Sequence, residues 1–464
     1  MYQRTKLQAK TALIGLSLLL PFCVNRIEAH DGSHQDSPQL KWPEHLYKPT
    51  PIPDRICTSL PQDPTTGFSV TWRTDVSATE GLAEIALAEG GPDFTSKAKQ
   101  IKGRTQAFKS NLGKALYHQV DFTDLKPATR YLYRVGSGTH WSEWIQFQTA
   151  SSEPEPFVFV YFGDAQNQIK SHWSRVVRQA FADASRAAFF LHAGDLVNSG
   201  ASDAEWGEWY YSNGFIPRSI PVVAAPGNHE MVNVKVKTDE KDETDDDKPK
   251  TVRQVTPHWF ATFAFPENGP KGLKETCYYI DYQGARIVVL NSNQETKLQA
   301  EWLEEVLSQP GPKWKIVSCH HPIYSSAAGR DNKPLRELWQ PIFDRHQVDL
   351  VLQGHDHTYS RTNPIKFRPG SLTELNVPTG QQTQDEGGTI YAVSVSGPKM
   401  YDLQPQTFMA NWATKTQLYQ VLKVDEDVLT YRAMTATGDL HDEFTIKKRD
   451  GQPNELVHSK IREK

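Results

Sequence analysis

The sequence is poor in cysteine, carries little net charge and contains hardly any long apolar stretch. Four cysteines occur in 464 residues, and 51 basic residues nearly balance 55 acidic ones, for a net charge of −4. This balance gives no reason to expect nucleic acid or an anionic membrane surface as a partner. Widely spaced cysteines do not form a disulfide framework, although Cys57 and Cys277 could pair in an oxidising compartment. The length exceeds one ordinary core, so we expect two domains.

One long apolar stretch lies near the N-terminus, at residues 12–24, behind several basic residues. Together with the small residue Ala29, this layout is typical of a secretory signal peptide. We therefore expect residues 1–29 to be removed and the mature protein to be secreted or periplasmic, with no membrane span. The alternatives are an uncleaved anchor, for which the stretch is shorter than the ~20 residues that cross a bilayer, and lipid attachment at Cys23, which lacks small residues before it.

The first third of the chain alternates apolar and polar residues over short runs. Residues 30–50 are polar and rich in proline, and we expect them to form a linker. From residue 51 to 150, runs such as 68–73 and 131–135 are separated by Gly, Pro and Asp clusters. Short alternating runs with this spacing predict a β-sandwich.

The remainder of the chain changes to strands that alternate with helices. Apolar residues recur at helical spacing in three segments, 173–184, 298–307 and 335–343. Strand and helix alternation predicts α/β layers, so we expect a two-domain α/β (α+β) protein whose second domain spans 155–448. Residues 235–250 are a charged insertion, interpreted as a solvated loop or as a lid near the site, and 449–464 are a tail.

Five short polar motifs each follow an apolar run. In order they are Gly163-Asp164, Gly194-Asp195, Gly227-Asn228-His229-Glu230, Cys319-His320-His321-Pro322 and Gly354-His355-Asp356-His357. Short apolar runs bounded by Gly or Pro are typical of buried strands, and ligands of open α/β sheets bind just past the carboxyl ends of the strands. The motifs therefore predict Asp, Asn and His side chains at one rim. This mixture of oxygen and imidazole ligands suits Zn, Mn or Fe.

The order and the residues of these motifs resemble those of the calcineurin-like metallophosphoesterases and, among them, the purple acid phosphatases. The family pattern is GD, GD-x-x-Y, GNH(E/D), V-x-x-H and GH-x-H, and Val317-Ser318-Cys319-His320 supplies the fourth motif here. The resemblance implies two facing sheets flanked by helices. It also implies a fibronectin-III-like domain at 51–150, where residues 53–56, 70–75 and 131–136 resemble the N-terminal domain of the family.

The resemblance implies a two-metal site that hydrolyses phosphate esters. Its ligands would be Asp164, Asp195, Asn228, His320, His355 and His357. Asp195 would bridge two divalent transition metal ions (Fe, Zn or Mn), with Asp164 and His357 on the first. The other three ligands would bind the second. Such a pair neutralises the anionic phosphoryl group, generates hydroxide and holds the in-line geometry. We expect His355 and His357 to point the same way, because residues two apart on an extended segment share a face.

Several polar residues next to the ligands are candidates for catalysis or substrate contact. The resemblance gives His229 the protonation of the leaving group, beside the catalytic bridging Asp195; the alternative is that His229 only orients a ligand. We interpret His321 as a hydrogen-bonding neighbour of the ligands. Arg330 and Arg361 could meet a phosphate oxygen, and a surface salt bridge is the alternative for each.

The chain departs from the family at two ligand positions. Asn198 stands where the purple acid phosphatases have the Tyr that binds ferric iron, and Gln166 stands where wider relatives have the His of D-x-H. Either residue could serve as a neutral oxygen ligand. Loss of the phenolate weakens the preference for Fe(III), so we expect a divalent pair and no purple colour. The family's substrate-contacting histidines are also absent from residues 325–331.

Together these features predict an exported, binuclear metal-dependent phosphatase that hydrolyses phosphate monoesters by attack of a metal-bound hydroxide. The expected partner is a small-molecule phosphoester, and no particular oligomeric state is expected. One alternative is a metal-dependent phosphodiesterase acting on nucleotides or lipid head groups. The other is a non-catalytic binding or adhesion protein. Loss of catalysis normally removes metal ligands, however, and here the expected ligand positions are filled.

Overall fold

The computed structural model describes residues 43–236, 250–367 and 387–459. The expected signal peptide at 1–29 and residues 237–249 of the charged insertion lie outside these ranges. Of the expected linker at 30–50, the last eight residues are described. They include a short 3₁₀-helix, η1 (Glu44–Tyr47), whose Tyr47 side chain is buried. The end of this segment is therefore packed rather than a free linker, because an aromatic side chain anchors it.

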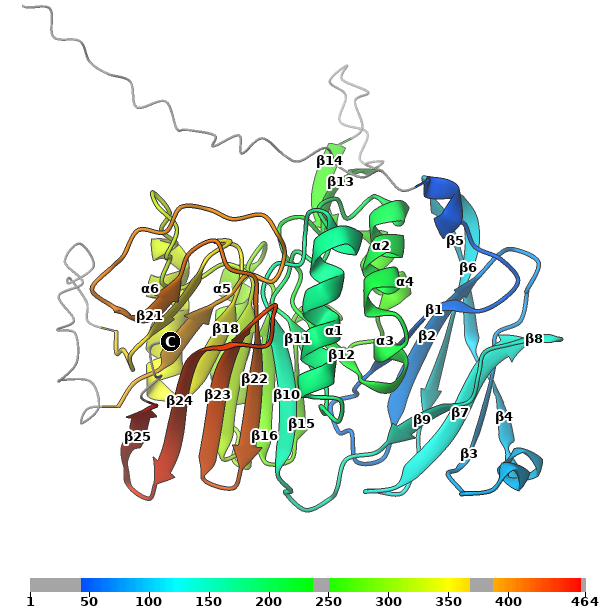
Figure 1. Cartoon of the computed structure of the whole chain (residues 1–464), viewed down its shortest axis with the longest axis horizontal. Helices are drawn as coiled ribbons and strands as arrows, with labels where there is room; N and C mark the ends of the chain where they lie inside the picture. The colour runs from blue at the N-terminus through cyan, green and yellow to red at the C-terminus, as the bar shows by residue number, and fades with distance from the viewer. Residues whose placement is uncertain (1–42, 237–249, 368–386, 460–464) are drawn as a thin grey trace, which may run out of the picture. The chain divides into compact units, whose positions relative to one another are not determined.

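The N-terminal domain is built from two β-sheets (Figure 1). One contains, in spatial order, β1 (Asp54–Ser59), β2 (Phe68–Thr74), β6 (Gly113–Phe122) and β5 (Arg104–Ser110). The other contains β4 (Lys99–Lys102), β3 (Leu82–Leu87), β7 (Arg130–Ser137) and β8 (His140–Trp141), with β9 (Ile145–Gln148) also on β7. A 3₁₀-helix, η2 (Pro92–Lys97), joins β3 to β4. Side chains such as Trp72 and Tyr133 fill the core of this domain, which confirms the expected all-β domain.

The first sheet of the N-terminal domain continues into the second domain. The eleven strands run β25-β24-β23-β22-β10-β11-β12-β1-β2-β6-β5. The new members are β10 (Phe157–Phe162), β11 (Phe190–His192), β12 (Val222–Ala224), β22 (Leu418–Asp425), β23 (Val428–Thr435), β24 (Leu440–Arg449) and β25 (Gln452–His458). The junction is a single parallel pairing of Ser59 with Val222. A junction this short leaves no periodic signal in the sequence.

A second sheet of seven strands has the order β15-β16-β17-β18-β20-β19-β21. Its members are β15 (Tyr278–Tyr282), β16 (Ala285–Leu290), β17 (Trp314–Cys319), β18 (Leu350–Gln353), β19 (Tyr359–Thr362), β20 (Ile390–Val393) and β21 (Met409–Ala413). Alternate residues of β16 face different partners. Ile287 and Val289 belong to the core shared with β10 and β11, whereas Val288 and Leu290 pack with α5 and α6.

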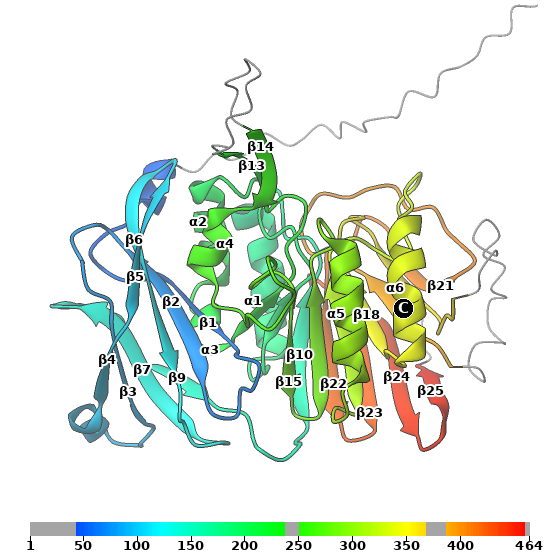
Figure 2. The same cartoon turned by 180° about the vertical axis from the view of Figure 1, so that it is seen from behind.

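The helices lie on the outer sides of the two sheets. The π-helical turn η3 (Ile169–Trp173), α1 (Ser174–Asp183), α2 (Asp203–Asn213) and α3 (Ile216–Ser219) lie with the large sheet (Figure 1). The helices α5 (Thr296–Ser308) and α6 (Lys333–Arg345) cover the seven-stranded sheet (Figure 2). A short α4 (Pro257–Thr262) follows the strand at Lys250–Val255. The sequence predicted α1, α5 and α6, and its resemblance to a known family implied two facing sheets. The three helices and the two-sheet architecture are confirmed.

Two expected boundaries differ in the structure. Residues 452–458, expected in the tail, form β25, because Leu456 is buried against the sheet and the strand pairs with β24. The ends of the charged insertion are also ordered. Strand β13 (Met231–Val236) pairs antiparallel with β14 (Lys250–Val255), so the insertion emerges from a hairpin. Among the described residues, Cys57, Cys277 and Cys319 are free and buried, and the possible Cys57–Cys277 disulfide is not formed.

Candidate metal centre

The predicted ligands follow strands of both sheets. Asp164, Asp195 and Asn228 come after the parallel neighbours β10, β11 and β12 of the large sheet. His320 comes after β17 and His355 after β18, which are parallel neighbours in the second sheet. Carboxyl ends of parallel strands meet at one edge of a sheet. The packing of the two sheets therefore brings five chain segments to one place.

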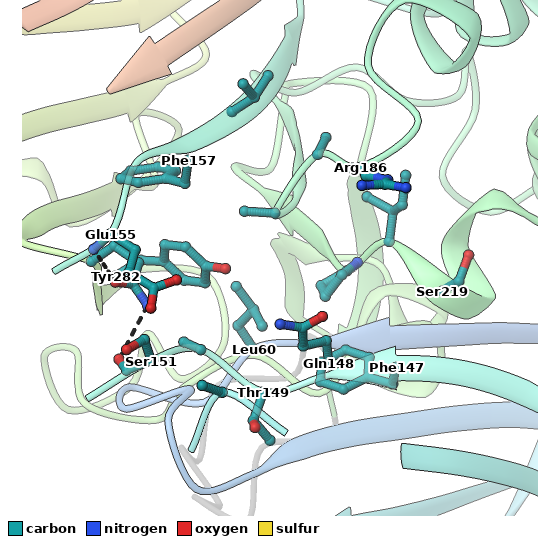
Figure 3. Close-up of a pocket in the computed structure, with 18 of the residues that line it drawn as sticks. Leu60, Phe147, Gln148, Thr149, Ser151, Glu155, Phe157, Arg186, Ser219 and Tyr282 are labelled. Carbon is teal, nitrogen blue, oxygen red and sulfur yellow. Dashed lines mark hydrogen bonds between the residues drawn. The ribbon is translucent and has the colours of Figure 1, made fainter. Parts of the chain in front are cut away.

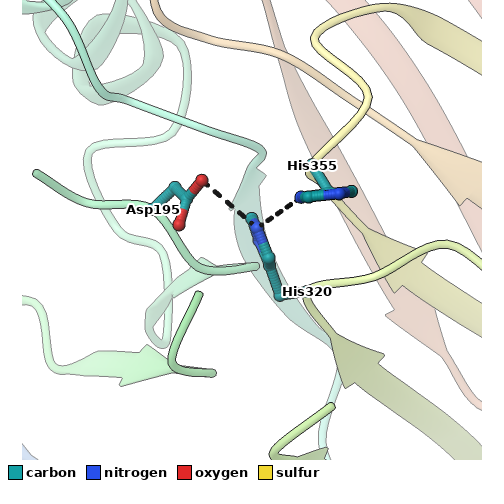
Figure 4. A group of neighbouring side chains, drawn as sticks. All are labelled: Asp195, His320 and His355. Atoms are coloured by element: carbon teal, nitrogen blue, oxygen red, sulfur yellow. Dashed lines mark hydrogen bonds and ion pairs between the residues drawn. The ribbon is translucent and has the colours of Figure 1, made fainter. Parts of the chain in front are cut away.

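Two groups of side chains have the spacing of metal sites. Asp195, His320 and His355 form one group, and Asp164, Asp195 and His357 form the other; within each, the ligand atoms lie within 4.8 Å of one another. Asp195 is the residue that the two groups share. Figure 4 shows Asp195 and His355 on either side of the His320 ring. This arrangement is what a carboxylate bridging two ions requires.

The distances between ligand atoms are short. Asp195 Oδ2 lies 3.2 Å from His320 Nε2, which is also 3.0 Å from Asn228 Oδ1 and 3.1 Å from His355 Nδ1. On the other side, His357 Nε2 lies 3.5 Å from Asp164 Oδ1. Oxygen and nitrogen atoms from distant parts of the chain thus converge on the same small volume.

Unusual backbone conformations aim three of these side chains. Asp195, His355 and His357 have φ angles of +51°, +71° and +49°, a region that non-glycine residues visit rarely and that clusters at functional sites. The segment that carries the two histidines is therefore a turn between β18 and β19. The expectation of an extended segment was wrong, because both histidines have positive φ angles, which an extended chain does not have. Gly227 is equally constrained, since a Cβ there would lie 2.1 Å from Asp195 Oδ1.

Backbone carbonyls fix the orientation of two histidine rings. Nδ1 of His320 lies 2.9 Å from the carbonyl oxygen of Ala193, and Nδ1 of His357 lies 2.9 Å from that of Lys399. A carbonyl only accepts hydrogen bonds, so Nδ1 carries the proton in both rings and Nε2 is left for a metal. Outer contacts of this kind are usual for histidine ligands.

Burial dominates the electrostatics of the site. Burial raises the pKa of Asp164 well above its usual range, and the neighbouring charge of Asp195 adds to the effect. Burial alone would lower the pKa of His320, but the adjacent Asp195 raises it to about 10. Burial lowers the pKa of His357 to about 3 and that of His355 further. A buried carboxylate is costly unless an opposite charge pairs with it, so the carboxylates of this cluster favour a cation beside them.

The residues present fit a pair of cations. Asp164 Oδ1 and Gln166 Oε1 are buried and have no hydrogen-bond partner among the described residues. Buried polar atoms are normally paired, so both oxygens are available to a bound ion. The donors comprise carboxylate, amide and imidazole groups, the set that Zn, Mn and Fe accept.

Of the two residues at the ligand positions where the chain differs from the family, Gln166 lies in the site. Its Nε2 lies 2.8 Å from Asp195 Oδ2 and 3.0 Å from His357 Nε2. Asn198 contacts its neighbours through its backbone, whose N–H and carbonyl groups are both hydrogen bonded. No hydrogen bond of the Asn198 side chain is found in the described part of the chain. The geometry thus favours Gln166 over Asn198 as a substitute ligand.

His229 and His321 both lie beside the ligands. Nε2 of His229 lies 3.9 Å from Asp195 Oδ2, and the side chain is 27% exposed. The ring is therefore within reach of both the ligand cluster and solvent. Nδ1 of His321 lies 2.8 Å from the hydroxyl of Ser292, and its ring packs 4.3 Å from that of His355. These are the neighbouring positions that the sequence predicted for the two residues.

The two arginine candidates have different surroundings. Arg330 donates to the carbonyl oxygen of His355 at 3.1 Å and keeps a third of its side chain exposed, so it lies at the rim of the site. Arg361 is buried and makes two hydrogen bonds to Asp442, at 2.7 and 3.0 Å. The expectation that Arg361 meets substrate or a surface partner was wrong, because the side chain is buried and its Nε and Nη2 bind a buried carboxylate.

Two residues at the site had not been singled out in the sequence. The Tyr401 ring packs 4.6 Å from that of His357, and the Arg330 guanidinium lies 4.5 Å from the Tyr401 ring centre. Arg253, on β14, donates to the carbonyl oxygen of Asn228 at 3.3 Å. Neither residue belongs to a motif, so only the folded arrangement places them there.

A separate cavity of about 620 Å³ lies away from these ligands (Figure 3). Its lining includes Phe157, Tyr282 and Arg186 and none of the predicted site residues. Phe157 begins β10, whereas Asp164 follows the end of that strand. The cavity and the ligand cluster therefore lie at opposite ends of β10, and the cavity is not the metal centre.

Family models match both domains of the chain. The calcineurin-like phosphoesterase family model matches residues 157–359. A second model, described as purple acid phosphatase, N-terminal domain, matches residues 53–149. The phosphoesterase match contains all five ligand-bearing motifs and ends two residues beyond the last, at residue 359.

Several similar proteins are plant phosphatases. Fe(3+)-Zn(2+) purple acid phosphatase 12 of Arabidopsis thaliana is 23% identical over 400 residues, covering 81% of this chain and 79% of its own. Purple acid phosphatase 1 of Ipomoea batatas is 26% identical over 345 residues, covering 70% of this chain and 67% of its own. The structure of a purple acid phosphatase from yellow lupin (Lupinus luteus) seeds matches with a TM-score of 0.67 at 20% identity. That match covers 86% of this chain and 75% of the lupin chain, and it shows a shared fold.

The fold, the paired ligand groups and the matching domain model define a class: residues 157–359 form a calcineurin-like phosphoesterase domain, and the chain is a phosphoric ester hydrolase. Within that class it is purple acid phosphatase-like, since the N-terminal domain model and the relatives both point to that group. The resemblance stated from the motifs is thus confirmed.

Proposed function

We propose that the protein is an exported, binuclear metal-dependent phosphatase that hydrolyses phosphate monoesters. The observation that carries the proposal is the place of Asp195 in both ligand groups. The groups supply three ligand atoms each, with one residue in common, and Asn228 adds an amide oxygen 3.0 Å from His320. A shared carboxylate at this position is the feature that a two-metal phosphoesterase needs.

Each residue has a distinct part in this proposal. A bound metal pair would neutralise the phosphoryl charge and make a water molecule acidic enough to supply a nucleophile. Asp195 holds the two positions at a fixed spacing. His229, with Nε2 toward Asp195 and part of its ring in solvent, gives a proton to the departing alkoxide. Arg330, charged and partly exposed at the rim, binds non-bridging oxygens of the phosphate group.

The ligand set supports a pair of divalent ions rather than a ferric centre. One relative is named an Fe(3+)-Zn(2+) enzyme, but here Asn198 stands at the motif position where the family has its Tyr ligand. Gln166, which contacts both Asp195 and His357, would offer a neutral amide oxygen. A neutral ligand stabilises a trivalent ion less than a phenolate does, so the proposed enzyme contains Zn, Mn or Fe(II) and is colourless.

Export is proposed from the N-terminal sequence. Basic residues, an apolar stretch at 12–24 and Ala29 are consistent with a cleaved signal peptide. Within the ranges that the structure describes, there is no helix of the length and hydrophobicity that crossing a membrane requires. Mass spectrometry of the protein recovered from the producing cell tests this proposal: a mature N-terminus near His30 supports it, and an intact Met1 in the cytoplasm overturns it.

The activity is tested by comparing p-nitrophenyl phosphate with bis-p-nitrophenyl phosphate, before and after chelation and after reloading with Mn, Zn or Fe(II). Faster hydrolysis of the monoester that depends on metal supports the proposal. Preference for the diester assigns the protein to the phosphodiesterases instead. Hydrolysis of neither ester by the metal-loaded protein would contradict the enzymatic function.

A further inference from the structure

The loop that follows Asp195 controls the orientation of His229. The carbonyl oxygen of Asn198 accepts a hydrogen bond from His229 Nδ1 at 2.6 Å. Because a carbonyl only accepts, Nδ1 carries a proton, and Nε2, which faces Asp195, carries the second proton of the imidazolium that acts as the acid. The same loop also holds the backbone of His229, since the amide of Gly200 donates to its carbonyl oxygen at 2.8 Å. The position of His229 therefore depends on the position of residues 198–200.

Glu205 holds this loop from helix α2. Its Oε2 accepts hydrogen bonds from the amides of Asn198 and Ser199, at 2.7 and 2.8 Å. In a usual Ser-x-x-Glu capping box, the glutamate would bind the amide of the capping serine. Here Ser202 caps the helix, but its own amide donates to the Ser199 carbonyl at 2.9 Å. The Glu205 carboxylate is thus directed away from the helix terminus and toward the loop that carries His229.

The start of α2 is in turn fixed to the N-terminal domain. Asp203, the first residue of the helix, makes ion pairs with Arg55 of β1 at 2.5 Å and Arg73 of β2 at 3.1 Å. Its backbone amide also donates a 2.9 Å hydrogen bond to Asn111 Oδ1, in the turn after β5. All three charged side chains are buried. Glu205 therefore extends from a helix end that two buried arginines hold in place.

We propose that Glu205 is a positioning residue for His229, and that the N-terminal domain supports this function by anchoring α2 through Asp203. The inference rests on the proposed phosphatase function, in which His229 protonates the leaving group. The Glu205 carboxylate fixes the backbone of Asn198 and Ser199, and the Asn198 carbonyl then holds the His229 ring with Nε2 toward the reacting phosphate. Glu205 itself does not touch the substrate.

Three variants test the proposal. Glu205→Ala removes the acceptor, Glu205→Gln keeps one carbonyl oxygen that can accept both amides, and Glu208→Ala changes a half-buried glutamate of the same helix that does not contact the loop. We expect Glu205→Ala to lower kcat by up to ~10²-fold, the usual effect of a misplaced catalytic group. KM and the metal content should stay unchanged. Glu205→Gln and Glu208→Ala should remain close to the unmodified enzyme.

Leaving-group dependence separates positioning from a merely structural effect. An alkyl phosphate needs more help with protonation than p-nitrophenyl phosphate does. Glu205→Ala should therefore slow hydrolysis of glycerol phosphate more than hydrolysis of p-nitrophenyl phosphate. In addition, Glu205→Ala should cost little in a His229→Ala background, because residues that act as a unit are not additive. Equal losses on both substrates, or full additivity, would overturn the proposal.

Hydrogen exchange gives a readout that needs no activity. The amides of Asn198 and Ser199 should exchange faster in Glu205→Ala than in Glu205→Gln or Glu208→Ala. Unchanged exchange would show that Glu205 does not hold the loop, and loss of metal in Glu205→Ala would show that it supports the ligands instead. If the unmodified protein hydrolyses no ester but the exchange pattern is as expected, the proposed phosphatase function is wrong, while the contact of Glu205 with the loop is supported.

Discussion

Asp195 places a charged group where burial penalises charge most. Its carboxylate is buried and, although burial raises its pKa, His320 lowers the pKa below the usual range. The pair is therefore ionic when no cation is present: His320 is the positive partner that a metal would replace. Removal of that partner from a buried carboxylate is costly. The site thus requires positive charge, which is the physical basis for its metal affinity.

Replacement of His229 by alanine tests its role. We expect kcat to fall by ~10²–10⁴-fold, the usual contribution of a positioned proton donor, while the metal content stays the same. Steady-state kinetics and elemental analysis of the same preparation measure both quantities. If the metal is lost together with activity, His229 is a ligand rather than an acid.

A pair of variants distinguishes the two candidate substitute ligands. Gln166→Ala should reduce the number of metal ions per chain, because Gln166 lies against both Asp195 and His357. Asn198→Ala is the matched control and should retain the full complement, because the contacts of Asn198 are made by its backbone. Elemental analysis after dialysis decides between them, and the reverse pattern would assign the ligand to Asn198.

At the scale of elements, the sequence was informative where a strand is apolar throughout and ends in a motif. The strands β10, β17 and β18 were located this way, as were α1, α5 and α6 from their helical spacing. The turn at His355 was not, because positive φ angles at non-glycine residues leave no composition signal. The buried position of Arg361 was missed for a related reason: its partner Asp442 lies 81 residues away.

Helix α2 depends on a buried charge pair, which makes part of the stability sensitive to acid. Burial raises the pKa of Asp203, but His258, Arg55 and Arg73 together hold it below its usual range. A carboxyl whose pKa is depressed by folding stabilises the protein above its unfolded pKa of ~3.9 and loses this contribution as pH falls through the folded value.

Asp203→Asn tests this dependence. The variant should lose ~3–5 kcal/mol at pH 7, because two buried arginines lose a charged partner. The difference in free energy of unfolding between the variant and the unmodified protein should shrink below about pH 4, where Asp203 of the unfolded chain binds a proton. Denaturant unfolding of the metal-free proteins from pH 7 to pH 3.5 measures it, with Glu208→Ala as control. A difference independent of pH would contradict the account.

At the scale of the whole molecule, one sheet joins the N-terminal domain to the catalytic domain. The pairing of β1 with β12 and the ion pairs of Asp203 connect the two. The sequence predicted both domains from their periodicities but not this connection, because a single strand pairing and a few long-range ion pairs have no periodic pattern. The site itself is assembled from segments between residues 164 and 357, so its integrity depends on the packing of both sheets.

Metal binding should therefore stabilise the whole fold. A ligand that binds only the folded state at 100 times its Kd adds about 2.7 kcal/mol. We expect chelation to lower Tm and Mn or Zn to restore it, in differential scanning calorimetry. The Asp195→Asn variant should have a lower Tm response to metal. An identical response in that variant would place the stabilising ion elsewhere.

Anomalous scattering from crystals grown with Mn or Zn tests the central claim most directly. Two peaks should appear, one on either side of the Asp195 carboxylate, one nearer Asp164 and His357 and the other nearer Asn228, His320 and His355. A single peak, or two peaks that Asp195 does not touch, would contradict the account.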